Sequence, residues 1–218
     1  MQERSAKSTP RWARRASFSS LCGMLSSMSE KAATTRIPLL DRDQVSPEIA
    51  AVYDALLKQR GVVPNMFKTL AHTPGLALGV AGFLKSLLSD GALPGWYKEL
   101  VATRLSVLLQ SEYAIAAHAL SARQKGASEI QIAAVQSDFE SGPFTEQEKL
   151  GLRCAERLHQ SAQRLDDAFF AQLKSVYTDS QIVELVGTAA AFELFPRLVD
   201  GLRIPTTPVP ESVAGKKD

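Results

Sequence analysis

The sequence predicts an all-α fold. Apolar residues recur at spacings of three and four positions along most of the 218-residue chain, and no segment shows the alternating pattern of a half-buried strand. Residues that cap helices stand before several of these segments. The apolar fraction of 45% and the charged fraction of 22% are typical of a globular domain. We therefore expect a single bundle of α-helices.

The first half of the chain predicts five helices. Ser46-Pro47-Glu48 combines an N-cap, a first-turn proline and an early acid, and Gly61 ends the helix that begins there. Asn65 is expected to cap a short helix that reaches residue 71, and Thr73-Pro74-Gly75 is expected to break it. The other three helices are predicted over residues 76–88, 94–110 and 111–125.

The second half predicts four more helices. Ser128 caps a short helix that ends near Val135, and Thr145-Glu146-Gln147-Glu148 is a capping box for a helix that reaches about residue 162. The last two helices are expected over residues 166–176 and 179–199. The chain could hold two repeats joined near Gly142-Pro143, but it shows no fixed-period self-similarity, so one domain is favoured.

Glu99 and His118 are the first candidate site residues. Ser111, Ala114 and His118 fall at i, i+3 and i+7, so they share one face of the helix predicted over residues 111–125. That helix and the one before it are separated by a short break, so they should pack as neighbours with Glu99 alongside His118. An ordinary imidazole titrates near pH ~6.5, which suits it to proton transfer near neutrality. The alternative is a core histidine bonded to a backbone carbonyl.

This arrangement resembles the signature of a known superfamily. The pattern Glu-x11-Cys-x-x-Cys-x3-His is typical of alkylhydroperoxidase D-like and carboxymuconolactone decarboxylase-like proteins, and Glu99, Ser111, Ala114 and His118 occupy its register. The resemblance extends over roughly residues 36–205 and implies a helical bundle that forms homodimers or homohexamers. The two cysteine positions hold Ser111 and Ala114, so the chemistry expected here is proton transfer.

Seven residues are candidates for the site. His118 would move a proton, Glu99 would orient the imidazole, and Tyr113 would stabilise a developing oxyanion. Ser111 is first a helix cap, His72 lies in a loop, and the two arginines are suited to gripping carboxylates. These candidate substrate contacts are Ser111, His72, Arg104 and Arg197. His159 looks like part of a solvent-facing surface, and the three histidines are too widely spaced to predict a metal site.

Three functions follow from these residues and the resemblance. The first is a cofactor-independent acid/base enzyme, a decarboxylase or double-bond isomerase, acting on a small unsaturated carboxylic acid or lactone from aromatic ring cleavage. The second is an alkylhydroperoxidase-like peroxidase, which is disfavoured because it needs a thiolate and a resolving thiol close together. The third is a binding scaffold that has lost its chemistry.

Charge, cysteine content and hydropathy narrow the classes of function to expect. Residues 1–27 carry a net charge of +4 and the rest of the chain carries −2, so the body gives no reason to expect nucleic-acid binding. Two cysteines do not make a disulfide framework, and Cys154 is expected to behave as a small buried hydrophobe. No apolar run approaches the ~18 residues of a membrane span, so a soluble, cytoplasmic protein is expected.

The two ends of the chain are expected to lie outside the helical domain. Residues 1–35 are expected to be a disordered basic leader. Its Arg- and Ser-rich part, residues 1–27, resembles a transit peptide or lies upstream of a natural start at Met28. The helical domain is predicted over residues 36–205, and residues 206–218 are predicted to be a flexible tail.

Overall fold

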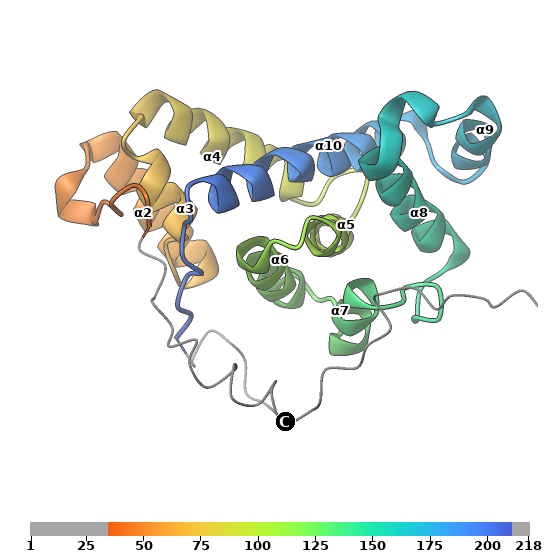
Figure 1. Cartoon of the computed structure of the whole chain (residues 1–218), viewed down its shortest axis with the longest axis horizontal. Helices are drawn as coiled ribbons and strands as arrows, with labels where there is room; N and C mark the ends of the chain where they lie inside the picture. The colour runs from red at the N-terminus through yellow and green to blue at the C-terminus, as the bar shows by residue number, and fades with distance from the viewer. Residues whose placement is uncertain (1–34, 211–218) are drawn as a thin grey trace, which may run out of the picture. The chain divides into compact units, whose positions relative to one another are not determined.

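The fold is built from α-helices alone. The computed structural model describes residues 35–210, so residues 1–34 of the predicted leader, Cys22 among them, and the last eight residues of the predicted tail lie outside the described part. Nine α-helices and two 3₁₀-helices follow one another in this part, which contains no β-strand. The all-α prediction is therefore confirmed (Figure 1). In chain order the elements are η2 (Arg42–Gln44), α2 (Pro47–Arg60), α3 (Asn65–Leu70), α4 (Pro74–Leu88), α5 (Gly95–Leu108), α6 (Glu112–Gln124), α7 (Glu129–Gln136), α8 (Glu146–Ser161), η3 (Ala162–Arg164), α9 (Asp167–Val176) and α10 (Asp179–Gly201).

Side-chain caps fix several of the helix starts. The hydroxyls of Ser128 and Thr145 each accept a hydrogen bond from the backbone amide three residues later, at 3.2 Å in both cases. The Asp166 carboxylate accepts one from the amide of Phe169 at 2.8 Å. These bonds satisfy backbone donors that the first turn of a helix leaves unpaired, and they confirm three predicted starts.

Two helix starts differ from the prediction because of prolines. Pro64, and not Asn65, is the residue before α3, and α4 begins at Pro74, two residues earlier than expected. Proline needs no amide partner in the first turn of a helix, so Pro74 begins α4 where it was expected to break the chain. The side chain of Asn65 instead donates to the carbonyls of Pro205 and Thr206, at 3.1 and 3.3 Å. The beginning of the predicted tail is thereby fastened to α3.

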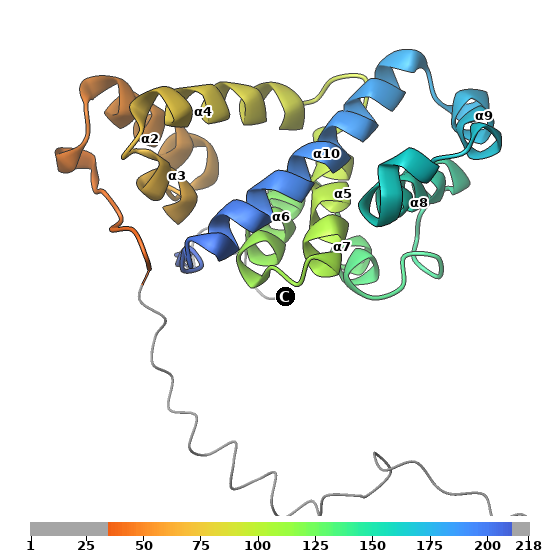
Figure 2. The same cartoon turned by 45° about the horizontal axis from the view of Figure 1, so that its top comes forward.

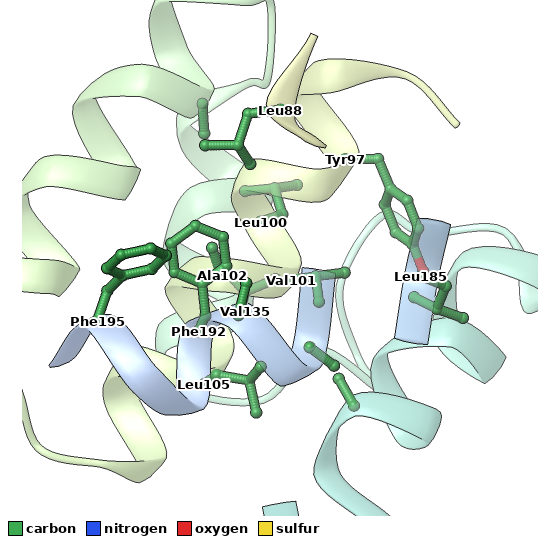
Figure 3. Close-up of a cluster of buried hydrophobic side chains, with 14 of the residues drawn as sticks. Leu88, Tyr97, Leu100, Val101, Ala102, Leu105, Val135, Leu185, Phe192 and Phe195 are labelled. Carbon is green, nitrogen blue, oxygen red and sulfur yellow. The ribbon is translucent and has the colours of Figure 1, made fainter. Parts of the chain in front are cut away.

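Helix α5 lies at the centre of the bundle. Figure 1 views it nearly end-on, with α6, α7, α8 and α10 around it, and Figure 2 shows α10 crossing it. Leu100, Val101, Ala102 and Leu105 are fully buried in the cluster drawn in Figure 3. Because neighbours cover α5 on nearly every side, its apolar character is explained by burial within this chain.

An ion pair between a buried lysine and a partly exposed glutamate fastens α5 to α10. The ammonium group of Lys98, 1% exposed, lies 2.9 Å from a carboxylate oxygen of Glu184. Glu184 also accepts hydrogen bonds from the backbone amides of Ala92 and Leu93, at 2.9 and 3.0 Å. Burial alone would raise the pKa of Glu184, but the Leu93 amide and the Lys98 charge outweigh it and lower the pKa. The pair thus sets the position from which α5 begins.

No helix within residues 35–210 has both the length and the apolar composition that crossing a membrane requires.

Removing the negative charge of Glu184 should destabilise the fold. In Glu184→Gln the amide oxygen can still accept from the loop amides, but Lys98 is left buried without a counter-charge, which should cost about 3 kcal/mol of unfolding free energy. The double variant Lys98→Met/Glu184→Gln removes the buried charge as well and should recover most of that loss. Urea denaturation measures both variants. A double variant less stable than Glu184→Gln would contradict this account.

Candidate functional site

Glu99 and His118 lie side by side, on α5 and α6. The two helices are joined by residues 109–111, where Gln110 takes a left-handed conformation with φ 56° and Ser111 bonds back to the carbonyl of Ser106 at 3.0 Å. This tight turn packs α6 against α5. Nδ1 of His118 comes to 2.7 Å from Oε2 of Glu99. The structure therefore brings together the two residues that the sequence spacing predicted to be neighbours.

The Glu99 carboxylate is buried and receives three hydrogen bonds from α6 and its end. Besides His118 on Oε2, the hydroxyl of Ser121 and the ammonium of Lys125 each donate to Oε1 at 2.6 Å. Lys125 also donates to the carbonyl of Leu88 at 2.7 Å. Burial by itself would raise the pKa of Glu99, but the hydrogen bond and charge of His118, followed by the charges of Lys125 and Arg60, lower it to about 2. Glu99 is therefore an anion at any ordinary pH.

An ionised Glu99 fixes the proton position on His118. A carboxylate can only accept a hydrogen bond, so Nδ1 must carry the proton and, in the neutral ring, Nε2 keeps a lone pair. Among the described residues, Nε2 has no hydrogen-bond partner. The edge of the ring packs against Phe192, with 4.3 Å between centroids, and the side chain is 12% exposed. His118 thus presents one free basic nitrogen from a rigid, largely desolvated position.

Two adjoining cavities are lined by members of the Glu99–His118 pair. The larger, of about 280 Å³, is lined by Glu99, Ser121 and Lys125 among others. The smaller, of about 50 Å³, is lined by His118 and Tyr113 and is otherwise mainly apolar. Both cavities share four lining residues, which are Arg60, Phe67, Leu84 and Leu88. Glu99 therefore lines a cavity with room for a small molecule, and His118 lines a smaller recess that shares part of its wall.

Tyr113 stands at the wall of the smaller cavity. Its hydroxyl accepts a hydrogen bond from the backbone amide of Met66 at 2.9 Å and lies 3.4 Å from the hydroxyl of Thr207. Burial raises the pKa of Tyr113, although Thr207, the Met66 amide and the charge of Arg60 oppose the change. The phenol therefore keeps its proton and can donate it.

Ser111 does not cap α6 through its side chain, contrary to expectation. Its hydroxyl donates instead to Oδ1 of Asp200 on α10, at 3.0 Å. A carboxylate is a stronger acceptor than a neutral oxygen, and the buried hydroxyl is turned toward it. Ser111 therefore ties α6 to α10, and it is not among the residues that line the cavities described above.

The other three expected substrate contacts also lie outside these cavities. Nε2 of His72 is 2.8 Å from the carbonyl of Pro38. Nε of Arg104 is bonded to Glu156 at 2.7 Å, and its guanidinium also reaches backbone carbonyls at the end of α7. Arg197 is bonded to Glu193 at 2.7 Å on the surface of α10. Each of the two arginines already has a carboxylate partner from its own chain, so the structure does not bring them to the site.

His159 also differs from expectation, because it is partly buried and not simply solvent-facing. Its Nδ1 lies 2.6 Å from Oε1 of Glu193, and its side chain is 23% exposed. The chain therefore contains a second His–Glu pair, which lines neither of the cavities beside Glu99 and His118.

Sequence reasoning missed three polar residues of the site. Ser121 and Lys125 fall at i+3 and i+7 from His118, so helical spacing alone could have placed them on the face that meets Glu99. Arg60 ends α2 and reaches the cavities only because α2 packs near α6, where Gln124 donates to the Arg60 carbonyl at 3.3 Å. The described residues contain no group of three His, Cys, Asp or Glu side chains placed to hold a metal ion.

The buried Glu99 carboxylate should make stability depend on acid pH. Its pKa of about 2 in the folded state is below the ordinary 4.5, so the folded state binds fewer protons in this range. Its contribution is complete above about pH 4.5 and is lost as pH falls toward 2. Glu99→Gln should be about 3 kcal/mol less stable at pH 6, because Lys125 and His118 lose their counter-charge.

Urea denaturation between pH 6 and 2.5 measures this effect. The stability difference between wild type and Glu99→Gln should shrink steadily below about pH 4.5. A difference that stays constant over this range would contradict the assignment of the low pKa to Glu99. Glu112→Gln, at an exposed position in the first turn of α6, is the matched control.

Comparison with known proteins supports the family resemblance that the sequence pattern indicates. Residues 74–157, which include Glu99 and His118, match the model of the Carboxymuconolactone decarboxylase family. A search of curated proteins found no match.

Several solved structures share the fold at low sequence identity. A peroxidase-related protein from Ralstonia eutropha JMP134, described as an alkylhydroperoxidase AhpD core, is 20% identical with a TM-score of 0.75 over 83% of this chain and 94% of its own. One from Silicibacter sp. TM1040 is 17% identical with a TM-score of 0.76 over 87% and 98%. The debrominase Bmp8, as a variant in complex with 2,3,4-tribromopyrrole, is 19% identical with a TM-score of 0.71 over 83% and 96%. At these identities the likeness shows the fold. The family match over residues 74–157 and the shared fold both support the resemblance to carboxymuconolactone decarboxylase-like and alkylhydroperoxidase D-like proteins, with Ser111 and Ala114 at the positions of the cysteine pair.

Proposed function

We propose that this protein is an acid/base enzyme that acts on a small unsaturated carboxylic acid or lactone, as a decarboxylase or double-bond isomerase. One observation carries the proposal. His118 is held by an ionised, buried Glu99, its Nε2 has no hydrogen-bond partner among the described residues, and its side chain lines a cavity with apolar walls and a cation. A satisfied core histidine would have both ring nitrogens engaged and no adjoining space.

Proton transfer at Nε2 accounts for either reaction. In an isomerisation, neutral His118 removes a proton from the carbon next to a carbonyl, the electron pair moves into an enolate, and the imidazolium returns the proton at another carbon. In a decarboxylation, the carboxylate leaves as CO₂, the same kind of enolate forms, and protonated His118 supplies its proton. Glu99 stabilises the imidazolium in both cases through Nδ1.

Tyr113 is suited to stabilising the enolate oxygen. Its hydroxyl already accepts from the Met66 amide, which leaves the phenolic proton for an acceptor. The only side chain within hydrogen-bond distance of that oxygen among the described residues is Thr207, at a long 3.4 Å. A substrate oxygen in the smaller cavity would be a better acceptor, and the developing negative charge would strengthen the bond.

Thiol chemistry is poorly supported in the described part of the chain. Ser111 and Ala114 occupy the positions of the family cysteines. Cys154 is buried on α8, and burial raises the pKa of its thiol to about 11, with the charge of Arg157 opposing the change. A thiol with that pKa is a poor nucleophile near neutrality.

The complex of Bmp8 with 2,3,4-tribromopyrrole supports a small planar ring as a ligand that this fold accommodates.

We also propose a homodimer or homohexamer. Helix α4 supports this, because it is strongly apolar and leaves Leu76, Leu78 and Phe83 between 41% and 50% exposed. A second copy of the chain would cover such a surface.

Replacing His118 should abolish turnover. The first compound to test is 4-carboxymuconolactone, after which the family is named, followed by other unsaturated ring-cleavage acids. NMR in D₂O follows loss of substrate and uptake of deuterium at carbon. His118→Ala should slow turnover at least ~100-fold, because the general acid/base is missing.

His159→Ala is the matched control. It removes an imidazole held by a carboxylate at 2.6 Å, as in the Glu99–His118 pair, but away from the two cavities. It should turn over at the wild-type rate, with circular dichroism confirming that both variants fold. Undiminished turnover in His118→Ala would contradict the proposed function.

A further inference from the structure

We propose that Arg60 anchors the carboxylate of the ligand at the junction of the two cavities, so that the apolar body of the ligand lies beside His118. The expected ligand is therefore an amphipathic carboxylate, with the charge at one end and a small unsaturated or aromatic body at the other. This anchor rests on the proposed function, because the bound carboxylate is taken to be that of the substrate. Its test is a binding measurement that does not require turnover.

Arg60 is placed where the cavities meet. It is half-buried at the end of α2 and lines the larger cavity, the smaller one and a third cavity beside Tyr113. The hydrogen bond from Gln124 to its backbone carbonyl fixes this end of α2 next to the end of α6. Of the cationic residues that the structure describes, Arg60 alone lines all three cavities.

The guanidinium of Arg60 has no protein partner within residues 35–210. Arg104 and Arg197 are neutralised by Glu156 and Glu193, but Arg60 takes part in no ion pair and its side chain makes no hydrogen bond. A partly desolvated guanidinium presents five donors in a planar fork that matches a carboxylate. Beside an open cavity such a group can exchange its water for a ligand carboxylate without first breaking a bond to the protein.

The nearby carboxylate cannot serve as that anion. Both oxygens of Glu99 are already held, by His118 on one side and by Ser121 and Lys125 on the other. The charge of Arg60 reaches the site, since it contributes to the lowered pKa of Glu99 and opposes the raised pKa of Tyr113. Lys85 adds a further positive charge at the wall of the larger cavity. The junction therefore has an excess of positive charge.

The opposite side of Arg60 is apolar. Met66, Phe192, Phe195 and Val199 line the smaller cavity around His118. Ala114, at the second cysteine position of the family pattern, contributes a short side chain to the same wall. An uncharged ring or unsaturated chain suits these walls, whereas a second charge would be desolvated there without a partner.

Isothermal titration with benzoate and with benzamide, its neutral amide analogue, tests the anchor. Wild type should bind benzoate more tightly than benzamide. Arg60→Gln should weaken benzoate binding about tenfold or more, the usual effect of losing a charge-assisted hydrogen bond, and should change benzamide binding little. Lys58→Gln is the matched control, since it removes one positive charge from an exposed position on α2 outside the cavities and should leave both affinities unchanged.

Other outcomes would overturn the anchor. They are no benzoate binding to wild type at millimolar concentration, unchanged benzoate affinity in Arg60→Gln, or equal losses for benzoate and benzamide, which would indicate a structural defect. The proposed function fails separately. Benzoate binding that depends on Arg60, without turnover that depends on His118, would support the anchor and contradict the proposed function. Turnover that depends on His118, with a KM that does not depend on Arg60, would support the proposed function and contradict the anchor.

Discussion

The site depends on the buried Glu99 carboxylate and its three donors. One anion at the centre of the bundle is satisfied by an imidazole, a hydroxyl and an ammonium group that all come from α6 and the residue that ends it. A buried carboxylate without such donors would be protonated or would destabilise the fold. The same bonds that make Glu99 tolerable in the core therefore set the distance and rotation between α5 and α6. Stability and the orientation of His118 have one common cause.

The position of α5 allows one residue to serve both purposes. Because α5 is enclosed by α6, α7, α8 and α10, the side chains of Lys98 and Glu99, each 1% exposed, must find partners inside the protein. Lys98 finds Glu184 on α10, and Glu99 finds the α6 donors. The Lys98–Glu184 pair contacts the loop before α5 and lines neither of the two cavities. Glu99 and its α6 donors line them. Lys98 and Glu99 thus fasten α5 to two different helices. Only Glu99 lies where it can take part in ligand chemistry.

The sequence predicted the features that depend on local chemistry. Capping residues such as Ser128 and Thr145 act within four residues of themselves, so their effect is visible in the sequence. The spacing from Glu99 to His118 spans one short turn between two helices, and it predicted their contact correctly. Features that depend on distant partners were not predictable. In the sequence Arg104 resembles a ligand-binding arginine, but the fold pairs it with Glu156 on α8. Ser111 resembles a helix cap, but the fold places Asp200 within hydrogen-bond distance of its hydroxyl. Arg60 stayed unnoticed for the same reason, since its place beside the cavities comes from the packing of α2 near α6.

The central claim is that Glu99 holds His118 with the proton on Nδ1 and with Nε2 free. Long-range ¹H–¹⁵N NMR on uniformly labelled protein reports the tautomer of each of the three histidines, and a His118→Gln sample identifies the signals of His118. In the neutral ring we expect the Nδ1–H tautomer in wild type and loss of that preference in Glu99→Gln. An Nε2–H tautomer of His118 in the wild-type protein would contradict this claim, because the ring would then have no free basic nitrogen.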